Sequence, residues 1–238
     1  MEIQRQGKAM VTTTLDTGRE ASTASQGRRL AAWSGIAGAV VVGAAAYLVF
    51  SLSPEGSGAD ATQRISDFYL GDGNSGGLLV AEPLSIVGGF LLLWFFGNLT
   101  GTLRGSKVDS GRYTSAALAG GVTFVVLAFA SITAQTTVAG STSFYPAFEV
   151  DPHAALMFSH LGYILLAGAM AAAAVLLAAT GVQLRRGAVG PRWLGTVAYV
   201  LVPISLLSMF FVYLPLLLFL IWVLLVSMSR LRTDQIPG

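Results

Sequence analysis

The chain has 238 residues, of which 54% are hydrophobic and 11% are charged, with a formal net charge of +2. A globular domain carries roughly 25% charged residues, so this composition excludes an ordinary soluble domain and indicates a membrane protein. The absence of cysteine excludes disulfides, thiolate metal sites and cysteine nucleophiles. The small net charge gives no reason to expect nucleic acid as a partner.

The N-terminal part of the sequence changes character at residue 30. Residues 1–29 are polar and show no apolar periodicity, so we expect a disordered cytoplasmic tail. The apolar run 30–52 is too long for the core of a signal peptide and is predicted to stay as the first transmembrane span. In the loop that follows, Ile65, Phe68 and Tyr69 alternate with polar residues, which predicts a short helix on the membrane surface.

The rest of the chain contains apolar runs longer than ~18 residues, the length that indicates a transmembrane helix. The stretch 193–228 is too long for one helix at ~1.5 Å per residue across a ~30 Å hydrocarbon core. We therefore expect a break near Met209–Leu214, with Pro215 in the first turn of the last helix. The expected fold is an all-α polytopic bundle over residues 30–230, followed by a short tail, 231–238. Its six expected spans are 30–52, 82–103, 114–138, 154–182, 193–209 and 214–228.

Basic residues beside the spans indicate the orientation. Lys and Arg concentrate in cytoplasmic loops, and here they lie in the N-terminal tail, in alternate loops and after the last span. Of the basic residues only Arg64 lies on the other side, where the loops hold seven carboxylates. Both termini are therefore expected in the cytoplasm. The basic residues near the later spans are Arg104, Lys107, Arg112, Arg185, Arg186, Arg192, Arg230 and Arg232.

Small and polar residues within the spans predict helix contacts. Gly35, Ala39 and Gly43 recur at steps of four, which favours close packing either within the bundle or in a homodimer. Both alternatives remain open on this pattern, and the lipid bilayer is the other expected partner. Side chains that we expect to form hydrogen bonds between helices are Asn98, Ser131, Thr133 and Gln135.

The candidate ligand residues gather toward the outer side. An ionisable group inside a span is a functional hypothesis because its burial in hydrocarbon is costly, and His160 is the main example here. A neutral, hydrogen-bonded histidine is the alternative. His153 lies seven residues earlier, too far for both to bind one metal from a straight helix. The candidate ligand set is His160, His153, Glu82, Asp67, Asp72 and Tyr163.

Cofactors and metals are not expected. No span contains a lysine that could form a retinal Schiff base, and one straight helix cannot supply a bis-histidine haem site. A metal site between the histidines and the outer carboxylates is an alternative that the pattern leaves open. The carboxylates considered for it are Asp67, Asp72, Glu82, Glu149 and Asp151.

Several short segments of the chain follow a pattern that is similar to that of a known group of membrane proteins. These segments are Phe68-Tyr69, the run 91–99 with Leu103-Arg104, and, near the C-terminus, 179–181, 191–195 and 220–227. In these segments the chain resembles a group of uncharacterised six-helix integral membrane proteins of actinobacteria, over about residues 30–230. The resemblance implies a bacterial plasma membrane. It supplies no activity and no catalytic residues.

Three functional hypotheses follow from the sequence. The leading one is a non-enzymatic accessory, scaffold or regulatory protein of the membrane, because the spans hold almost no ionisable residues. The second is a small transporter or binding protein for an apolar or lipid-like ligand, with a cavity opening near His160. The third is an intramembrane enzyme that uses His160 together with outer carboxylates. We favour the absence of enzymatic activity.

Overall fold

The structure is a computed structural model of the chain. It describes residues 2–53, 61–70, 75–106, 111–145, 147, 149–188, 190–211 and 213–233. Within the helices, the side chains of residues 2–25, 28, 61, 62, 66, 70, 75 and 233 lie outside the description.

The part of the chain that is described consists of helices joined by short connections. They are α1 (Glu2–Leu52), α2 (Ala61–Leu70), α3 (Ser75–Arg104), α4 (Arg112–Phe144), α5 (Pro152–Arg185), α6 (Arg192–Leu206), the 3-10 helix η1 (Leu207–Met209) and α7 (Tyr213–Thr233). Six of them contain stretches long and apolar enough to cross a membrane. The predicted all-α bundle of six membrane-spanning helices is confirmed, and each expected span lies inside one of these helical stretches.

Two helices begin earlier than the sequence suggested. α3 starts at Ser75 instead of residue 82, and it continues through Pro83. The added turns are stabilised by packing, since Leu78 and Ala81 are fully buried. The helix α1 starts at Glu2, where we expected a disordered tail. No proline occurs before Pro54 to interrupt it. The domain boundary at residue 29 stays a prediction.

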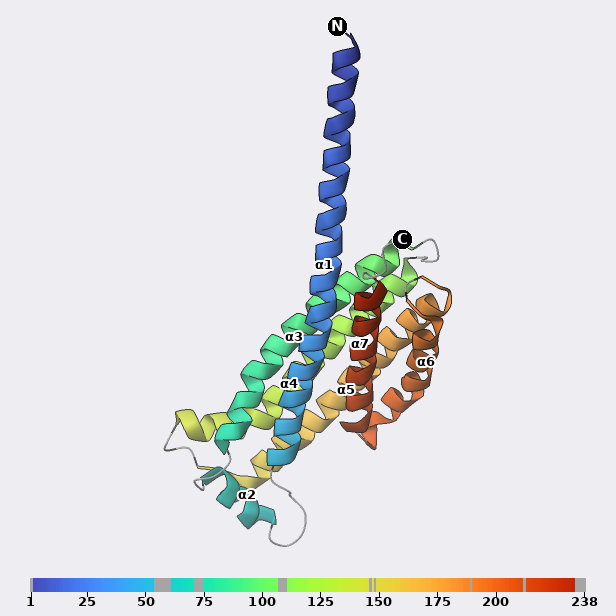
Figure 1. Cartoon of the computed structure of the whole chain (residues 1–238). Coiled ribbons are helices and arrows are strands. Elements are labelled where there is room, and N and C mark those ends of the chain that lie inside the picture. The colour runs from blue at the N-terminus through green and yellow to red at the C-terminus, as the bar shows by residue number, and fades with distance from the viewer. Residues whose placement is uncertain are drawn as a thin grey trace.

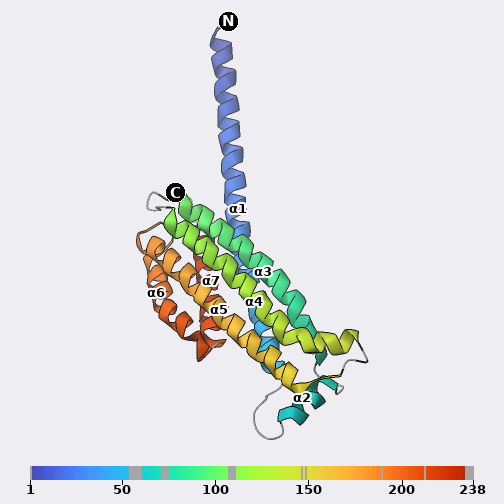
Figure 2. The ribbon, with the colours of Figure 1, turned by 180° about the vertical axis from the view of Figure 1, so that it is seen from behind.

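The six long helices form a closed ring. α1 contacts α3 and α7, and the ring continues through α3–α4, α4–α5, α5–α6 and α6–α7 (Figures 1 and 2). The N-terminal part of α1 projects beyond one end of the bundle, and α7 finishes at the same end (Figure 1). We call this the basic end, because Arg104, Arg185 and Arg230 lie in the last turns of α3, α5 and α7 there. The opposite end, where α2 lies, is the α2 end.

The core towards the basic end is filled by large side chains. Phe124 and Phe219 meet with their ring centroids 4.7 Å apart, and Trp222 stacks on Phe219. The Trp222 indole N–H donates a hydrogen bond to the Leu194 carbonyl at 3.2 Å, which joins α7 to α6. This part of the bundle is closed by aromatic packing. The fully buried aromatic side chains are Phe95, Phe96, Phe124, Phe219 and Trp222.

The stripe of small residues on α1 packs largely within the chain. A Cβ atom at Gly35 would lie 2.6 Å from Cδ2 of Phe95 and would also meet the Ser227 hydroxyl. Ala39 is 3% exposed and belongs to the same core. The stripe therefore serves contacts of α1 with α3 and α7, and Gly35 and Ala39 leave no room for a second copy. Gly43 differs, because a Cβ atom there would make only an ordinary van der Waals contact, 3.5 Å from Cδ1 of Leu220.

Candidate functional site

Two polar side chains of α4 lie in the core towards the α2 end. Ser131 is fully buried, and Gln135, one turn later, is 6% exposed. The Ser131 hydroxyl donates a 2.7 Å hydrogen bond to the Gly162 carbonyl of α5. The Gln135 amide donates to the Ser131 hydroxyl at 3.2 Å. The expected hydrogen bond between helices is confirmed for Ser131.

A glycine on α5 makes space for the buried amide. A Cβ atom at Gly162 would lie 2.8 Å from Cδ of Gln135, which no side chain tolerates without movement. α5 can therefore approach the Gln135 side chain closely only because residue 162 has none. This close approach holds the Gln135 side-chain amide against α5. The side-chain oxygen of Gln135 makes no hydrogen bond to the described part of α5.

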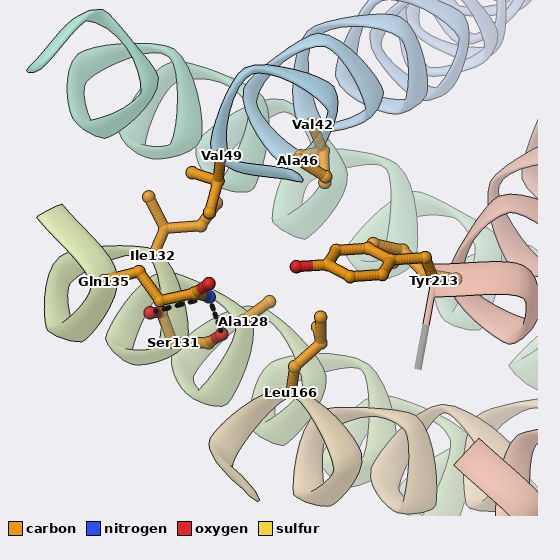
Figure 3. A pocket seen from close by; sticks show the side chains of 10 residues that line it. Val42, Ala46, Val49, Ala128, Ser131, Ile132, Gln135, Leu166 and Tyr213 are labelled. Carbon is orange, nitrogen blue, oxygen red and sulfur yellow. Dashed lines mark hydrogen bonds between the residues drawn. The ribbon is translucent and has the colours of Figure 1, made fainter. Parts of the chain in front are cut away.

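A small cavity lies beside these groups, between α1, α4, α5 and α7. Its volume is about 20 Å³, enough for one water-sized group, which requires about 10–15 Å³. The walls are mostly apolar, and the polar side chains lining it are Ser131, Gln135 and Tyr213 (Figure 3). Within the described chain, the Gln135 side-chain oxygen Oε1 is buried and has no hydrogen-bond partner. A buried acceptor of this kind costs free energy until a donor reaches it.

Tyr213 enters the cavity from the first turn of α7. Its hydroxyl points toward Gln135 (Figure 3). The ring is packed by Phe50 of α1 at 4.5 Å and by Tyr163 of α5 at 6.0 Å, both measured between ring centroids. The Tyr163 phenol approaches the Tyr213 hydroxyl, although no hydrogen bond of normal geometry forms there among the described residues. The aromatic neighbours hold the Tyr213 hydroxyl at the cavity.

A larger groove runs between α1 and α7 on the outside of the bundle. Its volume is about 250 Å³, and its described lining residues carry no charge. Gly43 leaves it open: a Cβ atom there would meet only the side chain of Leu220, at 3.5 Å. The groove and the cavity share Ala46, Tyr213 and Leu216. The groove therefore adjoins the cavity at Tyr213.

A third hollow lies beneath α2. It has a volume of about 20 Å³ and includes Gln135 in its lining, so both small hollows reach this side chain. α2 covers it with Ile65 and Tyr69, which are 1% and 8% exposed. Burial raises the pKa of the Tyr69 phenol above its ordinary value, so Tyr69 is neutral at physiological pH. The short helix predicted around Ile65 thus closes the α2 end of the bundle.

The predicted histidines do not face these hollows. His153 and His160 are both exposed on α5. Residues two positions apart on a helix point in different directions, so His160 faces away when Gly162 packs against Gln135. Neither histidine lines any of the three hollows, and α5 contributes Leu166 to the cavity, so a role for His160 stays a prediction.

The other predicted ligand residues are scattered. Asp67 is exposed on α2 and accepts a 2.9 Å hydrogen bond from Gln63. Glu82 is half-buried on α3, and Asp72 lies outside the described residues. Of the predicted set, Tyr163 is the one that lies beside the cavity, through its contact with Tyr213.

Asp151, just before the start of α5, has a structural role. The Asp151 carboxylate accepts a 2.9 Å hydrogen bond from the His153 backbone N–H and caps the helix, with Pro152 at its first position. Over the described ranges, no three His, Cys, Asp or Glu side chains gather where they could hold a metal ion.

The sequence did not single out Gly43, Gly162 or Tyr213 as site residues. Glycines are frequent in any membrane bundle, and Tyr213 was interpreted only as an aromatic residue at interfacial depth. Ser131 and Gln135, spaced i,i+4 in an apolar span, were the signal that did point to this place.

No family model matches the chain, and the comparisons with curated proteins and with solved structures gave no match either.

Proposed function

We propose that the protein is a non-enzymatic, multi-pass protein of a bacterial plasma membrane that binds a lipid-like amphiphile, which enters laterally between α1 and α7. This is the second of the three hypotheses drawn from the sequence. The observation that carries it is the position of the groove, whose inner wall at Tyr213 is also the wall of a cavity with polar groups.

The shape of the groove suits an apolar chain. Its rim is formed by exposed apolar and aromatic side chains, among them Phe50 and Leu217, which are 57% and 56% exposed. Such a surface is compatible with lipid hydrocarbon and gives an acyl or isoprenoid chain a direct path from the bilayer. Ligand pockets are typically apolar with a few polar groups that fix orientation, and the two adjoining hollows together have that character.

The orientation is part of the proposal. Arg104, Arg185, Arg230 and Arg232 end three helices at the basic end, which supports a cytoplasmic location for that end by the positive-inside rule. Both termini would then be cytoplasmic, and the groove would open to the outer leaflet. Membership of the actinobacterial group also remains a proposal, and it supports the bacterial membrane.

The two other hypotheses have less support. An enzyme that uses His160 requires partners for a proton or a substrate, yet His160 is exposed on α5 and does not line the cavity. A scaffold role gives no reason for a buried amide oxygen that has no partner among the described residues and lies in a cavity adjoining a groove.

The test is retention of a native lipid-like molecule. The protein is purified from its native membranes in mild detergent, and bound organic molecules are extracted and quantified by mass spectrometry. We expect one class of amphiphile at near-stoichiometric amount in the wild type. In Gly43→Leu we expect it to be lost, because the leucine side chain would occupy the groove.

Gly97→Leu is the matched control. Gly97 is exposed on α3, and a Cβ atom there meets nothing within 4 Å. This variant has the same substitution in a spanning helix but leaves the groove intact, and it should retain the amphiphile. Equal retention by wild type and Gly43→Leu, or only bulk lipid in every sample, would contradict the proposal.

A further inference from the structure

We infer that the polar group of the bound amphiphile is a single uncharged hydroxyl, held between the Gln135 side-chain oxygen and the Tyr213 hydroxyl. The inference rests on the proposed function, because it needs the chain of the amphiphile to occupy the α1–α7 groove. It adds the class of ligand: a long-chain or isoprenoid alcohol, or another lipid that ends in a neutral hydroxyl.

The size of the cavity limits the polar group. A volume of about 20 Å³ admits one water-sized group. A hydroxyl has that size, whereas a phosphate ester or a sugar does not fit. The cavity adjoins the groove at Tyr213, so a chain lying in the groove can direct its terminal group past the tyrosine ring.

Gln135 and Tyr213 together favour a ligand group that can both donate and accept a hydrogen bond. Oε1 of Gln135 is buried, has no partner among the described residues and can only accept a hydrogen bond. The Tyr213 hydroxyl can donate or accept, and it points toward Gln135 (Figure 3). A ligand hydroxyl satisfies both groups at once by donating to Gln135 and accepting from Tyr213. An ether or a hydrocarbon leaves the Gln135 oxygen without a donor.

The charge of the surroundings excludes an anionic group. The described residues that line the cavity and the groove include no Lys, Arg or His. A carboxylate, sulfate or phosphate bound there would be a buried charge without a counterion, which costs several kcal/mol in real proteins. The site is therefore expected to discriminate against anionic lipids with the same chain.

The experiment compares probes that differ only at the terminal group. Radiolabelled hexadecanol, its methyl ether and hexadecyl sulfate are titrated onto the full-length protein in lipid nanodiscs, with empty nanodiscs as background. We expect saturable binding of the alcohol. We expect binding of the ether to be weaker by about tenfold or more, because its methoxy group is larger than the cavity admits and has no proton to donate to Gln135. We expect no saturable binding of the sulfate.

Variants connect the selectivity to the two side chains. Gln135→Leu and Tyr213→Phe should each weaken hexadecanol binding by about tenfold while leaving the ether nearly unchanged. Tyr145→Phe removes a hydroxyl from an exposed tyrosine at the end of α4 and should change neither. Thermal unfolding of each variant shows whether it is folded. If Gln135→Leu does not fold, Tyr213→Phe still tests the inference, because it removes only a single oxygen.

The outcomes separate this inference from the proposed function. If all three probes bind equally, or if both cavity variants keep full preference for the alcohol, the hydroxyl assignment is overturned. The proposed function survives that result provided that Gly43→Leu abolishes binding and Gly97→Leu does not. If no probe binds saturably to the wild type and Gly43→Leu has no effect on native lipid retention, both fail.

Discussion

The two ends of the bundle are built differently, because α6 and α7 are shorter than α4 and α5 and do not reach the α2 end. Towards the basic end, all six helices are present and buried aromatic rings fill the space between them. At the α2 end, the turn between α6 and α7 comes early: α7 has 21 residues, whereas α4 and α5 have 33 and 34. At ~1.5 Å per residue, α4 and α5 extend about 20 Å further than α7.

This difference explains where the hollows lie. Beyond the turn between α6 and α7, neither of these two helices lines the space beside α1, α4 and α5, and α2 covers it instead (Figures 1 and 2). Gln135, Ser131 and Tyr213 lie where the ring of six helices becomes incomplete. A closed half supplies the stability of the bundle, and an incomplete half leaves space that a ligand can use.

The largest expected effect is loss of the aromatic core. Trp222→Ala should lower the free energy of unfolding by about 3–5 kcal/mol, the usual cost of truncating a buried aromatic residue. Trp222 is fully buried and donates a hydrogen bond to Leu194. Unfolding in mixed detergent micelles, followed by circular dichroism, measures the change. The control is Trp33→Ala, since Trp33 is 59% exposed, and its effect should stay within about 0.5 kcal/mol. Equal losses would contradict a core at this place.

A smaller effect is expected where α5 meets the buried amide. Gly162→Ala should destabilise by about 1–3 kcal/mol, because the methyl group must displace Gln135. Gly168→Ala on the same helix is the control, as its Cβ would lie 3.4 Å from Leu127, and it should be neutral or stabilising. The double variant Gly162→Ala/Gln135→Ala should recover most of the loss in the same unfolding assay. No recovery would show that the clash lies elsewhere.

The smallest expected effect concerns the hydrogen bond between α4 and α5. Ser131→Ala should cost about 0.6 kcal/mol, the average for such bonds inside membranes. Ser141→Ala is a fair comparison, because the Ser141 hydroxyl bonds within α4 to the Thr137 carbonyl. An effect of Ser131→Ala no larger than that of Ser141→Ala in the unfolding assay would mean that the Ser131–Gly162 bond adds nothing to the packing.

Much of the fold could be predicted from the sequence, because the length of each apolar run reports directly on the thickness of the bilayer. The turn between α6 and α7 was also predicted, from the length of the last apolar stretch. The early start of α3 could not be predicted, since the span was placed by the apolar run from residue 82, and only the burial of Leu78 and Ala81 explains the added turns.

The candidate site was less predictable. His160 was chosen because it is ionisable, yet the rotation of α5 about its axis decides which residues face the core, and the tight contact of Gly162 with Gln135 sets that rotation. Tyr213 is 78 residues after Gln135 in the sequence, and nothing local indicates that they share a cavity. Gln135 and Tyr213 line the same cavity because of the order in which the helices are arranged around the ring.

The most direct measurement is an experimental structure with a probe bound. Crystals of the wild type would be grown from a lipidic mesophase that contains brominated hexadecanol, and the bromine would be located by anomalous scattering. The account predicts bromine between α1 and α7 beside Gly43, with the alcohol oxygen at Gln135 and Tyr213. Bromine distributed over other lipid-facing surfaces, with the α1–α7 groove closed by side chains, would contradict it.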